Sequence, residues 1–305
     1  MDLKLSFKMI DLYFRLKFKI LVLISPRNLS MRISSYPYIS WDTYYELSSI
    51  RITSQLELNE FYKKLENNQN FTSIYLNSDF LNDFKKIYFT DEKLVIERLL
   101  VVESDEHNFT VDLIPLLNKT KKIYANHLIG KYPNIYPIPV GIERQSYRSS
   151  GVLRDFRKVT SIFPQKRYIP FLIAWNDNNN KKRSIYKEQF TESINALVIN
   201  QRINAQALHK IMRKTLFVPC PAGNGIDTHR IWESVYLGAV PVVLKSEFCG
   251  DENWPVLVIE NWSELLKMNR EDLIQLYRKH VLTQNEAVGF GLNVLENIFG
   301  NVNDK

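Results

Sequence analysis

The sequence predicts an α/β protein with two Rossmann-like α/β domains that face each other across a cleft. In the second half of the chain, short apolar segments alternate with amphipathic segments of about ten residues, which is the pattern of a parallel sheet wound with helices. The first half repeats this alternation less regularly, and 305 residues suffice for two domains. Such paired units bind nucleotides at the carboxyl ends of their strands.

The predicted elements follow the hydrophobic pattern in chain order. In the first half, we expect strands at 19–24, 73–76, 95–102 and 122–124, and helices at 55–67 and 79–87. In the second half, we expect strands at 171–175, 196–199, 216–218, 240–244 and 255–259, and helices at 184–195, 205–214 and 230–237. Helical sequence continues from residue 263 to the end.

The division into domains is placed near residue 160, in the stretch after Gly151. Residues 1–160 then form the N-terminal domain and residues 161–305 the C-terminal domain. The last helix is expected to pack back on the N-terminal domain.

Composition narrows the class of protein. Hydrophobic residues make up 45% and charged residues 24%, as in a globular protein with real cores. The sequence has no stretch of about 20 uncharged apolar residues, so no transmembrane helix is predicted. The apolar run 20–24 is too short for a signal-peptide core. We therefore expect a cytoplasmic protein. Cys220 and Cys249 cannot build a disulfide framework, and no Cys/His cluster has metal-ligand spacing.

The formal charge of +7 favours an anionic partner. Nucleic acid, a phospholipid surface and a nucleoside diphosphate each fit, as does a merely solvated basic surface. The basic residues are dispersed and lack the aromatic–basic signature of an RNA-recognition module, so we expect no nucleic-acid partner. Residues 3–16 form a basic amphipathic pattern, which predicts either peripheral membrane contact or a helix packed on the first domain.

The most informative segment is 217–243, which reads FVPCPAGNGIDTHRIWESVYLGAVPVV. A strand ends at Pro219, a glycine-bearing loop covers 222–226, and a helix begins near Asp227 or Thr228, either of which can cap it. Gly223 and Gly225 would let backbone N–H groups approach an anion, and the start of the helix adds a positive dipole end.

Two charged residues of this helix suit a nucleotide. Arg230 lies in the first turn, where its guanidinium could grip a diphosphate, and Glu233 lies three residues later, placed to accept from a ribose hydroxyl. The alternative is a surface ion pair worth under ~1 kcal/mol, with Asp227 as a cap and nothing more. The segment lacks both a P-loop motif and the third glycine of a dinucleotide fingerprint, which excludes P-loop NTPases and disfavours a dehydrogenase.

The block from Cys220 to Glu233, followed by LGAVPVV at 237–243, resembles the donor-site signature of exostosin-like glycosyltransferases. That group includes bacterial capsule and lipopolysaccharide enzymes and the xylosyltransferase that acts on ribitol-phosphate glycans. The resemblance implies a GT-B fold, a nucleotide-sugar donor, inversion at the anomeric carbon and no obligatory metal or other cofactor.

Upstream segments extend the resemblance. ISWDTY at 39–44 is similar to a Ser-Gly-Asp-Thr-Phe element of these enzymes, with Trp41 in the place of the glycine. YANH at 124–127 and IPVGIE at 138–143 resemble the end of the first domain. Asn176 with Arg183 resembles a polar loop whose arginine reaches the donor phosphate.

Inverting transfer needs a base for the acceptor hydroxyl and positive groups for the departing diphosphate. The residues predicted to contact the donor are Arg183, Gly223, Asn224, Gly225, Asp227, His229, Arg230 and Glu233. For the base, the first choice is Asp105, which follows the strongest strand of the first domain, and the second is Asp42. The alternative is that 103–107 is a solvated loop. His127 and His209 are expected to be structural.

Three functions remain open from the sequence. The first is a glycosyltransferase of cell-surface polysaccharide synthesis, acting from a nucleotide sugar on a glycan or lipid-linked glycan acceptor. The second is a nucleotide- or glycan-binding module of the same fold that lacks a competent base. The third is a basic scaffold that binds nucleic acid through its bulk charge, and the presence of Arg230 and Glu233 argues against it.

Overall fold

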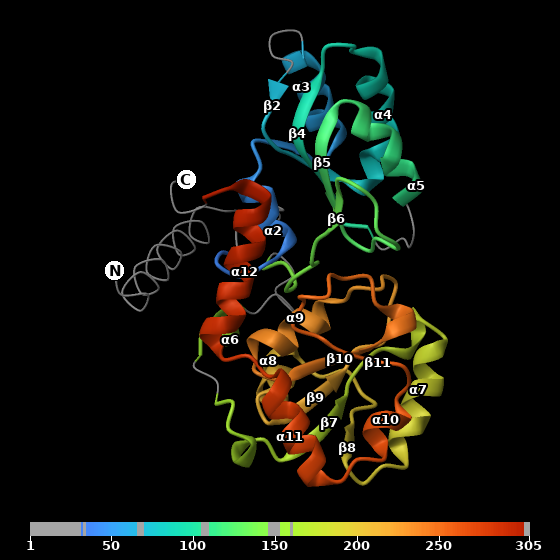
Figure 1. The fold of residues 1–305 in the computed structure, drawn as a ribbon, viewed down its shortest axis with the longest axis vertical. Coiled ribbons are helices and arrows are strands. Elements are labelled where there is room, and N and C mark those ends of the chain that lie inside the picture. Colours follow the sequence, from blue (N-terminus) through green and yellow to red (C-terminus); the bar gives the residue numbers. More distant parts are fainter. Residues whose placement is uncertain are drawn as a thin grey trace.

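The structure is a computed structural model that describes residues 32, 35–65, 70–104, 110–145, 153–158 and 161–301. Two parallel sheets flanked by helices lie one above the other (Figure 1), which confirms the predicted fold class, a GT-B-like pair of Rossmann-like α/β domains. The predicted strand 19–24, the amphipathic segment 3–16 and Asp105 lie outside the described residues. Residues 159–160 do too, so the exact division near residue 160 stays a prediction.

The N-terminal sheet has six parallel strands in the order β1-β3-β4-β5-β6, with β2 beside the start of β4. Its strands are β1 (Ile50–Ile52), β2 (Asn70–Phe71), β3 (Ile74–Asn77), β4 (Val95–Val102), β5 (Thr120–Ala125) and β6 (Ile135–Pro137). Its helices are α2 (Trp41–Leu47), α3 (Gln55–Leu65), α4 (Leu81–Thr90) and α5 (Thr110–Leu113). The central strand β4 ends in the apolar run LLVV because helices cover both faces of a parallel sheet.

The C-terminal sheet has five parallel strands in the order β8-β7-β9-β10-β11. They are β7 (Ile169–Ile173), β8 (Ala196–Val198), β9 (Thr215–Pro219), β10 (Val240–Leu244) and β11 (Leu257–Ile259). Helix α6 (Leu153–Phe156) precedes the predicted division near residue 160. The helices after it are α7 (Lys182–Thr191), α8 (Ala205–Met212), α9 (His229–Tyr236), α10 (Ser263–Leu266), α11 (Arg270–His280) and α12 (Gln284–Phe299). The chain passes from β7 out to β8 and returns to β9 on the other side of β7. Ligands of such sheets bind at the carboxyl ends of the two strands where the order reverses.

Short 3-10 turns complete the described chain at Ser78–Phe80, Ile114–Asn118, Pro164–Lys166, Asp177–Asn179 and Lys245–Glu247. All five predicted strands of the second half are present, and the helical sequence after residue 263 forms three helices. The sequence pattern missed the short elements α2, α5, α6, β1, β2 and β6, each of which has only two to seven residues.

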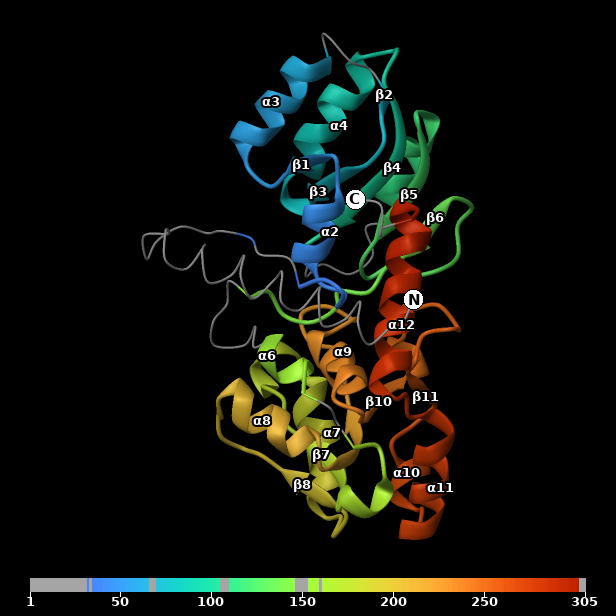
Figure 2. The same cartoon turned by 90° about the vertical axis from the view of Figure 1, so that its left-hand side faces the viewer.

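Helix α12 runs along both domains (Figure 2). It begins with a capping box, in which Thr283 and Glu286 each satisfy a backbone N–H of the other. At its far end, the hydroxyl of Tyr124 on β5 donates to the carbonyl of Asn297 at 3.2 Å. This helix therefore ties the C-terminal half of the chain to the N-terminal sheet.

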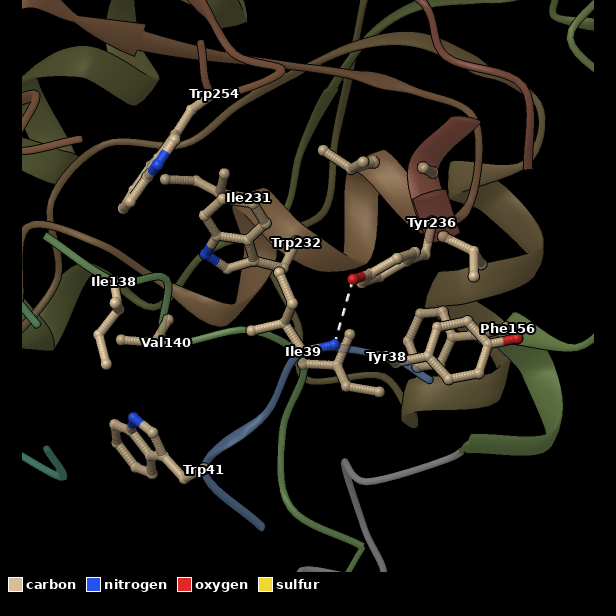
Figure 3. Close-up of a cluster of buried hydrophobic side chains, with 14 of the residues drawn as sticks. Tyr38, Ile39, Trp41, Ile138, Val140, Phe156, Ile231, Trp232, Tyr236 and Trp254 are labelled. Carbon is tan, nitrogen blue, oxygen red and sulfur yellow. Dashed lines mark hydrogen bonds between the residues drawn. The ribbon is translucent and has the colours of Figure 1, made fainter. Parts of the chain in front are cut away.

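A buried cluster joins the two halves near α9 (Figure 3). The hydroxyl of Tyr236 accepts the backbone N–H of Ile39 at 3.2 Å. Trp232 stacks on Phe290 of α12 with ring centroids 5.9 Å apart and meets Trp254 edge-on at 5.0 Å. Because the same cluster buries Ile39 of the N-terminal domain beside these C-terminal side chains, it fixes α9 against that domain.

Candidate functional site

A pocket of about 230 Å³ lies at the carboxyl ends of β7 and β9, where the strand order reverses. Its walls come from the ends of these two strands and from the start of α9: Ala174, Trp175, Asn176, Asn179, Arg183, Val218, Pro219, Cys220, Pro221, Thr228 and Arg230. We call this the switch-point pocket. Two arginines and a helix N-terminus give it positive character, which suits an anionic ligand.

The glycine loop of 222–226 is held by bonds within the protein. The Gly223 N–H donates to the carbonyl of Gly225 at 2.9 Å, and the Ala222 N–H donates to Glu247 at 3.0 Å. The Gly223 N–H thus already has an acceptor in this conformation, and its approach to an anion stays a prediction. Gly225 is required for a different reason: a Cβ at this position would lie 2.3 Å from the ring of His127, across the domain interface.

Arg183 is buried and braces this loop. Its Nε donates to the carbonyl of Ala222 at 2.9 Å, its Nη2 to Pro221 at 3.0 Å and its Nη1 to Asn176 at 3.1 Å. Burial lowers the pKa of the guanidinium. Arg183 thus fixes the ends of β7 and β9 relative to each other, and it still lines the switch-point pocket.

Asp227 links the two domains. One carboxylate oxygen accepts the Val140 N–H at 2.7 Å, and the other accepts the indole N–H of Trp232 at 2.8 Å. The side chain does not cap α9, whose N-cap residue is Thr228. Burial raises the pKa of Asp227 to about 7. Both carboxylate oxygens of Asp227 thus already accept hydrogen bonds from the protein. Contact between Asp227 and the donor stays a prediction.

Arg230 and Glu233 form the ion pair expected at this spacing, with Nη1 and Oε2 2.9 Å apart. Glu233 is buried, so the pair is not a surface pair. The other oxygen of Glu233 lies 3.8 Å from Nε2 of the buried His209, and Nδ1 of His209 lies 3.2 Å from Asp155. Burial alone would raise the pKa of Glu233, but Arg230 and His209 hold it below the usual value. Glu233 therefore anchors Arg230 in the pocket, and its predicted role toward a ribose stays a prediction.

A second pocket, of about 290 Å³, lies between the domains and shares Asn179, Arg183, Thr228 and Arg230 with the first. We call it the cleft pocket. Its other walls come from both domains: Trp41, His127, Val140, Glu143, Gly223, Asn224, Gly225, Asp227, His229 and Glu233. His229 and Glu143 face each other there, with Nε2 and Oε2 3.6 Å apart.

The N-terminal side of the cleft holds buried charges. Glu103 follows β4 with φ of 66° and accepts from Arg32, Tyr75, Asn77 and Arg144. Burial alone would raise the pKa of Glu103, but the two arginines hold it below its usual value.

Asp42, the second predicted base, lies beside this cluster with Oδ1 4.0 Å from Nη1 of Arg32. Burial raises its pKa to about 6. Asp42 is 1% exposed and is not among the residues that line the cleft pocket. The first predicted base, Asp105, lies outside the described residues and stays a prediction.

The described residues contain neither a cluster of metal ligands nor a membrane-spanning helix. No three or more His, Cys, Asp or Glu side chains there are grouped so that they could hold a metal ion. None of the helices described has the length and apolar character needed to cross a bilayer.

Comparisons with known proteins show no family for this chain. No family model matches the chain, and no curated protein matches it. Among solved structures, the chain is similar to the pneumococcal O-GlcNAc transferase GtfA in complex with UDP and GlcNAc. That similarity has 10% identity, a TM-score of 0.34, and coverage of 81% of this chain and 57% of GtfA. The N-terminal domain of Candida albicans trehalose-6-phosphate phosphatase is similar at 11% identity, with a TM-score of 0.36 and 84% and 80% coverage. Similarities this remote carry no assignment of function.

The sequence pattern pointed to the donor loop but not to the opposite wall. Glu143, His127 and Trp41 all line the cleft pocket, and none was predicted as a site residue. A signal for Glu143 was present, because IPVGIE at 138–143 belongs to the resemblance already noted. The positions of these side chains depend on pairings between residues about 90 or more apart, which no local pattern encodes.

Proposed function

We propose that the protein is an inverting glycosyltransferase of the exostosin-like kind, which takes a sugar from a nucleoside diphosphate donor. The observation that carries this proposal is the switch-point pocket, lined by Arg183 and Arg230 and open to the start of α9. The donor-loop signature of 220–243 supports it independently. The proposed acceptor is a glycan or lipid-linked glycan of a cell-surface polysaccharide.

The diphosphate would lie at the N-terminus of α9. Backbone N–H groups of the first turn of a helix have no partner within the helix, so they can bind anions. Arg230 stands in this turn, 28% exposed at its side chain, and Glu233 holds it through Nη1. Phosphate oxygens placed here would meet a charged donor and a helix dipole together.

Transfer would then use the adjoining cleft pocket. A sugar attached to the diphosphate can reach the cleft because both pockets share Arg230 and Thr228. Arg230 and the first turn of α9 would stabilise the negative charge that grows on the leaving diphosphate. Enclosure between two domains would make attack by water slower than attack by the acceptor hydroxyl.

Thermal shift with UDP, GDP, CDP and ADP tests donor binding. At least one of them, added at one hundred times its Kd without metal, should stabilise the protein by about 2.7 kcal/mol. No shift with any of the four would contradict the proposal. Stabilisation without any sugar transfer would instead favour the non-catalytic binding module.

Arg230→Ala should weaken binding of that nucleotide by about 1.5–3 kcal/mol, roughly 10- to 150-fold in Kd, because a charged hydrogen bond is lost. Arg202→Ala is the matched control, since Arg202 is an exposed arginine of the same domain outside both pockets. Arg230→Lys keeps a cation beside Glu233 and separates loss of binding from loss of folding. Equal affinity of Arg230→Ala and Arg202→Ala would show that the donor site is misplaced.

A further inference from the structure

The segment that crosses from β6 into the cleft, residues 139–143, is fixed at each of its first four residues. The Pro139 carbonyl accepts the hydroxyl of Tyr44 at 3.0 Å, and the Val140 N–H donates to Asp227 at 2.7 Å. The Gly141 carbonyl accepts Nδ1–H of His229 at 2.8 Å, and the Ile142 N–H donates to the Ile39 carbonyl at 2.8 Å. Two of these bonds come from the N-terminal domain and two cross to the C-terminal domain.

Gly141 permits this arrangement. Its φ is 71°, and a Cβ at this position would lie 2.1 Å from the carbonyl oxygen of Ile39. A side chain is therefore excluded on both counts. The close approach fixes where the next side chains point, which is how a protein preorganises a reacting group.

Glu143 is the carboxylate that this segment presents to the cleft pocket. Its Oε1 accepts the N–H of Arg144 at 2.8 Å, so the carboxylate is oriented, and its side chain is 20% exposed. Its Oε2 lies 3.6 Å from Nε2 of His229, which is too long for a hydrogen bond.

His229 has a defined tautomer. Because the Gly141 carbonyl can only accept, Nδ1 of His229 carries the proton, and Nε2 turns to Glu143. The ring is held from the side by Trp41, whose centroid lies 5.2 Å away in an edge-on contact. The space between Oε2 and Nε2 is thus bordered by two oriented polar atoms from opposite domains.

We propose that Glu143 is the general base of the transfer, an inference that rests on the proposed function. An acceptor hydroxyl at the Glu143–His229 gap gives its proton to Oε2. The hydroxyl oxygen forms the new bond to the anomeric carbon, and the bond from that carbon to the phosphate oxygen breaks. The electron pair of that bond leaves with the nucleoside diphosphate, toward Arg230 and the start of α9.

Geometry favours Glu143 over Asp42, the second base predicted from the sequence. Asp42 is shut off from the cleft pocket, whereas Glu143 lines it. A base must lie within hydrogen-bond reach of the hydroxyl it deprotonates. The Glu143 carboxylate faces His229, the first residue of the helix that would bind the leaving group.

The test uses the full chain and the nucleotide that stabilises it. Its sugar conjugates are offered with water as acceptor, and release of nucleoside diphosphate is measured. They are UDP-glucose, UDP-N-acetylglucosamine and UDP-xylose for UDP, GDP-mannose for GDP, CDP-glucose for CDP and ADP-glucose for ADP. Glu143→Gln should keep the thermal shift of the parent protein and lower the rate of release by roughly 10²- to 10⁴-fold. Glu188→Gln, which removes an exposed carboxylate of α7, is the matched control.

Asp42→Asn and Asp105→Asn are compared under the same conditions. The assignment of Glu143 is overturned if Glu143→Gln keeps more than half of the parent rate, or if the rate falls only in one of the two aspartate variants. Either result leaves the proposed transferase function unaffected. The proposed function itself is overturned if the parent protein binds none of the nucleotides. It is also overturned if the parent protein binds a nucleotide but releases nucleoside diphosphate from none of the conjugates.

Discussion

Two neighbouring carboxylates, Asp42 and Glu103, respond in opposite ways to the same burial. Glu103 receives hydrogen bonds from Arg32 and Arg144 and has a lowered pKa. Asp42 lies 4.0 Å from Arg32, and burial raises its pKa to about 6. Direct hydrogen bonds offset the loss of water for one carboxylate, and longer contacts do not for the other.

This difference predicts a pH-dependent effect of Asp42→Asn. Between the unfolded value of 3.8 and the folded value of about 6, the folded protein holds a proton that the unfolded chain has released. The contribution of Asp42 to stability therefore falls as pH rises through this window. Asp42→Asn should raise the free energy of unfolding by up to about 3 kcal/mol at pH 8 and by under about 1 kcal/mol at pH 4.

Urea unfolding of Asp42→Asn and the parent protein at both pH values measures the difference. Glu188→Gln, an exposed charge removal, should leave the difference near zero throughout. A stability difference for Asp42→Asn that is the same at pH 4 and pH 8 would contradict the raised pKa.

His229 offers a second test at the scale of one residue. Its contact with the Gly141 carbonyl predicts that the neutral ring carries its proton on Nδ1. The ¹⁵N chemical shifts of the side chain report the tautomer, and the chain has only five histidines to resolve. His229→Gln identifies the signal. A bare Nδ1 with the proton on Nε2 would be incompatible with the proposed cleft.

Helix α12 shows how one element holds two domains together. Its two central glycines, Gly289 and Gly291, have opposite surroundings: a Cβ at Gly289 meets nothing within 4 Å, and a Cβ at Gly291 lies 2.8 Å from the hydroxyl of Tyr236. That hydroxyl accepts the Ile39 N–H, so it is fixed by the other domain. Gly291 therefore lets the helix approach the interface.

The two glycines form a matched pair for mutation. Gly289→Ala should stabilise the protein by about 0.5–1 kcal/mol, because alanine restricts the unfolded chain and favours helix. Gly291→Ala should destabilise it by about 1–3 kcal/mol through overpacking against Tyr236. Urea unfolding at one pH compares them. Equal effects of both substitutions would mean that α12 does not lie against Tyr236.

Elements were predictable where the pattern was local and long. The apolar runs of β7, β9 and β10 are buried at every or nearly every position, so their hydrophobicity alone marks them. β1 and β6 have three residues each and carry an exposed residue in the middle, which a window of apolar residues does not detect. α2 begins within the segment ISWDTY at 39–44, which was interpreted as a family motif and not as the start of a helix. Its N-cap was visible in the sequence, because Ser40 accepts from the Thr43 N–H.

At the scale of the whole molecule, the cleft is held by polar bonds between distant residues. Val140 with Asp227, His127 with Asp227, and Gly141 with His229 are each separated by 87 to 100 positions. The sequence predicted one side of the cleft because the donor loop is continuous in the chain. It could not predict the other side, because Glu143 and Trp41 reach the cleft only through these long-range pairings.

The central claim is that a nucleoside diphosphate binds between the carboxyl ends of β7 and β9. A crystal structure of the protein with whichever of UDP, GDP, CDP or ADP stabilises it most tests this directly. We expect the diphosphate at the first turn of α9, within hydrogen-bond distance of Arg230, and the Glu143 carboxylate facing it across the cleft. A nucleotide bound elsewhere, or a diphosphate that makes no contact with Arg230 or the start of α9, would contradict the claim.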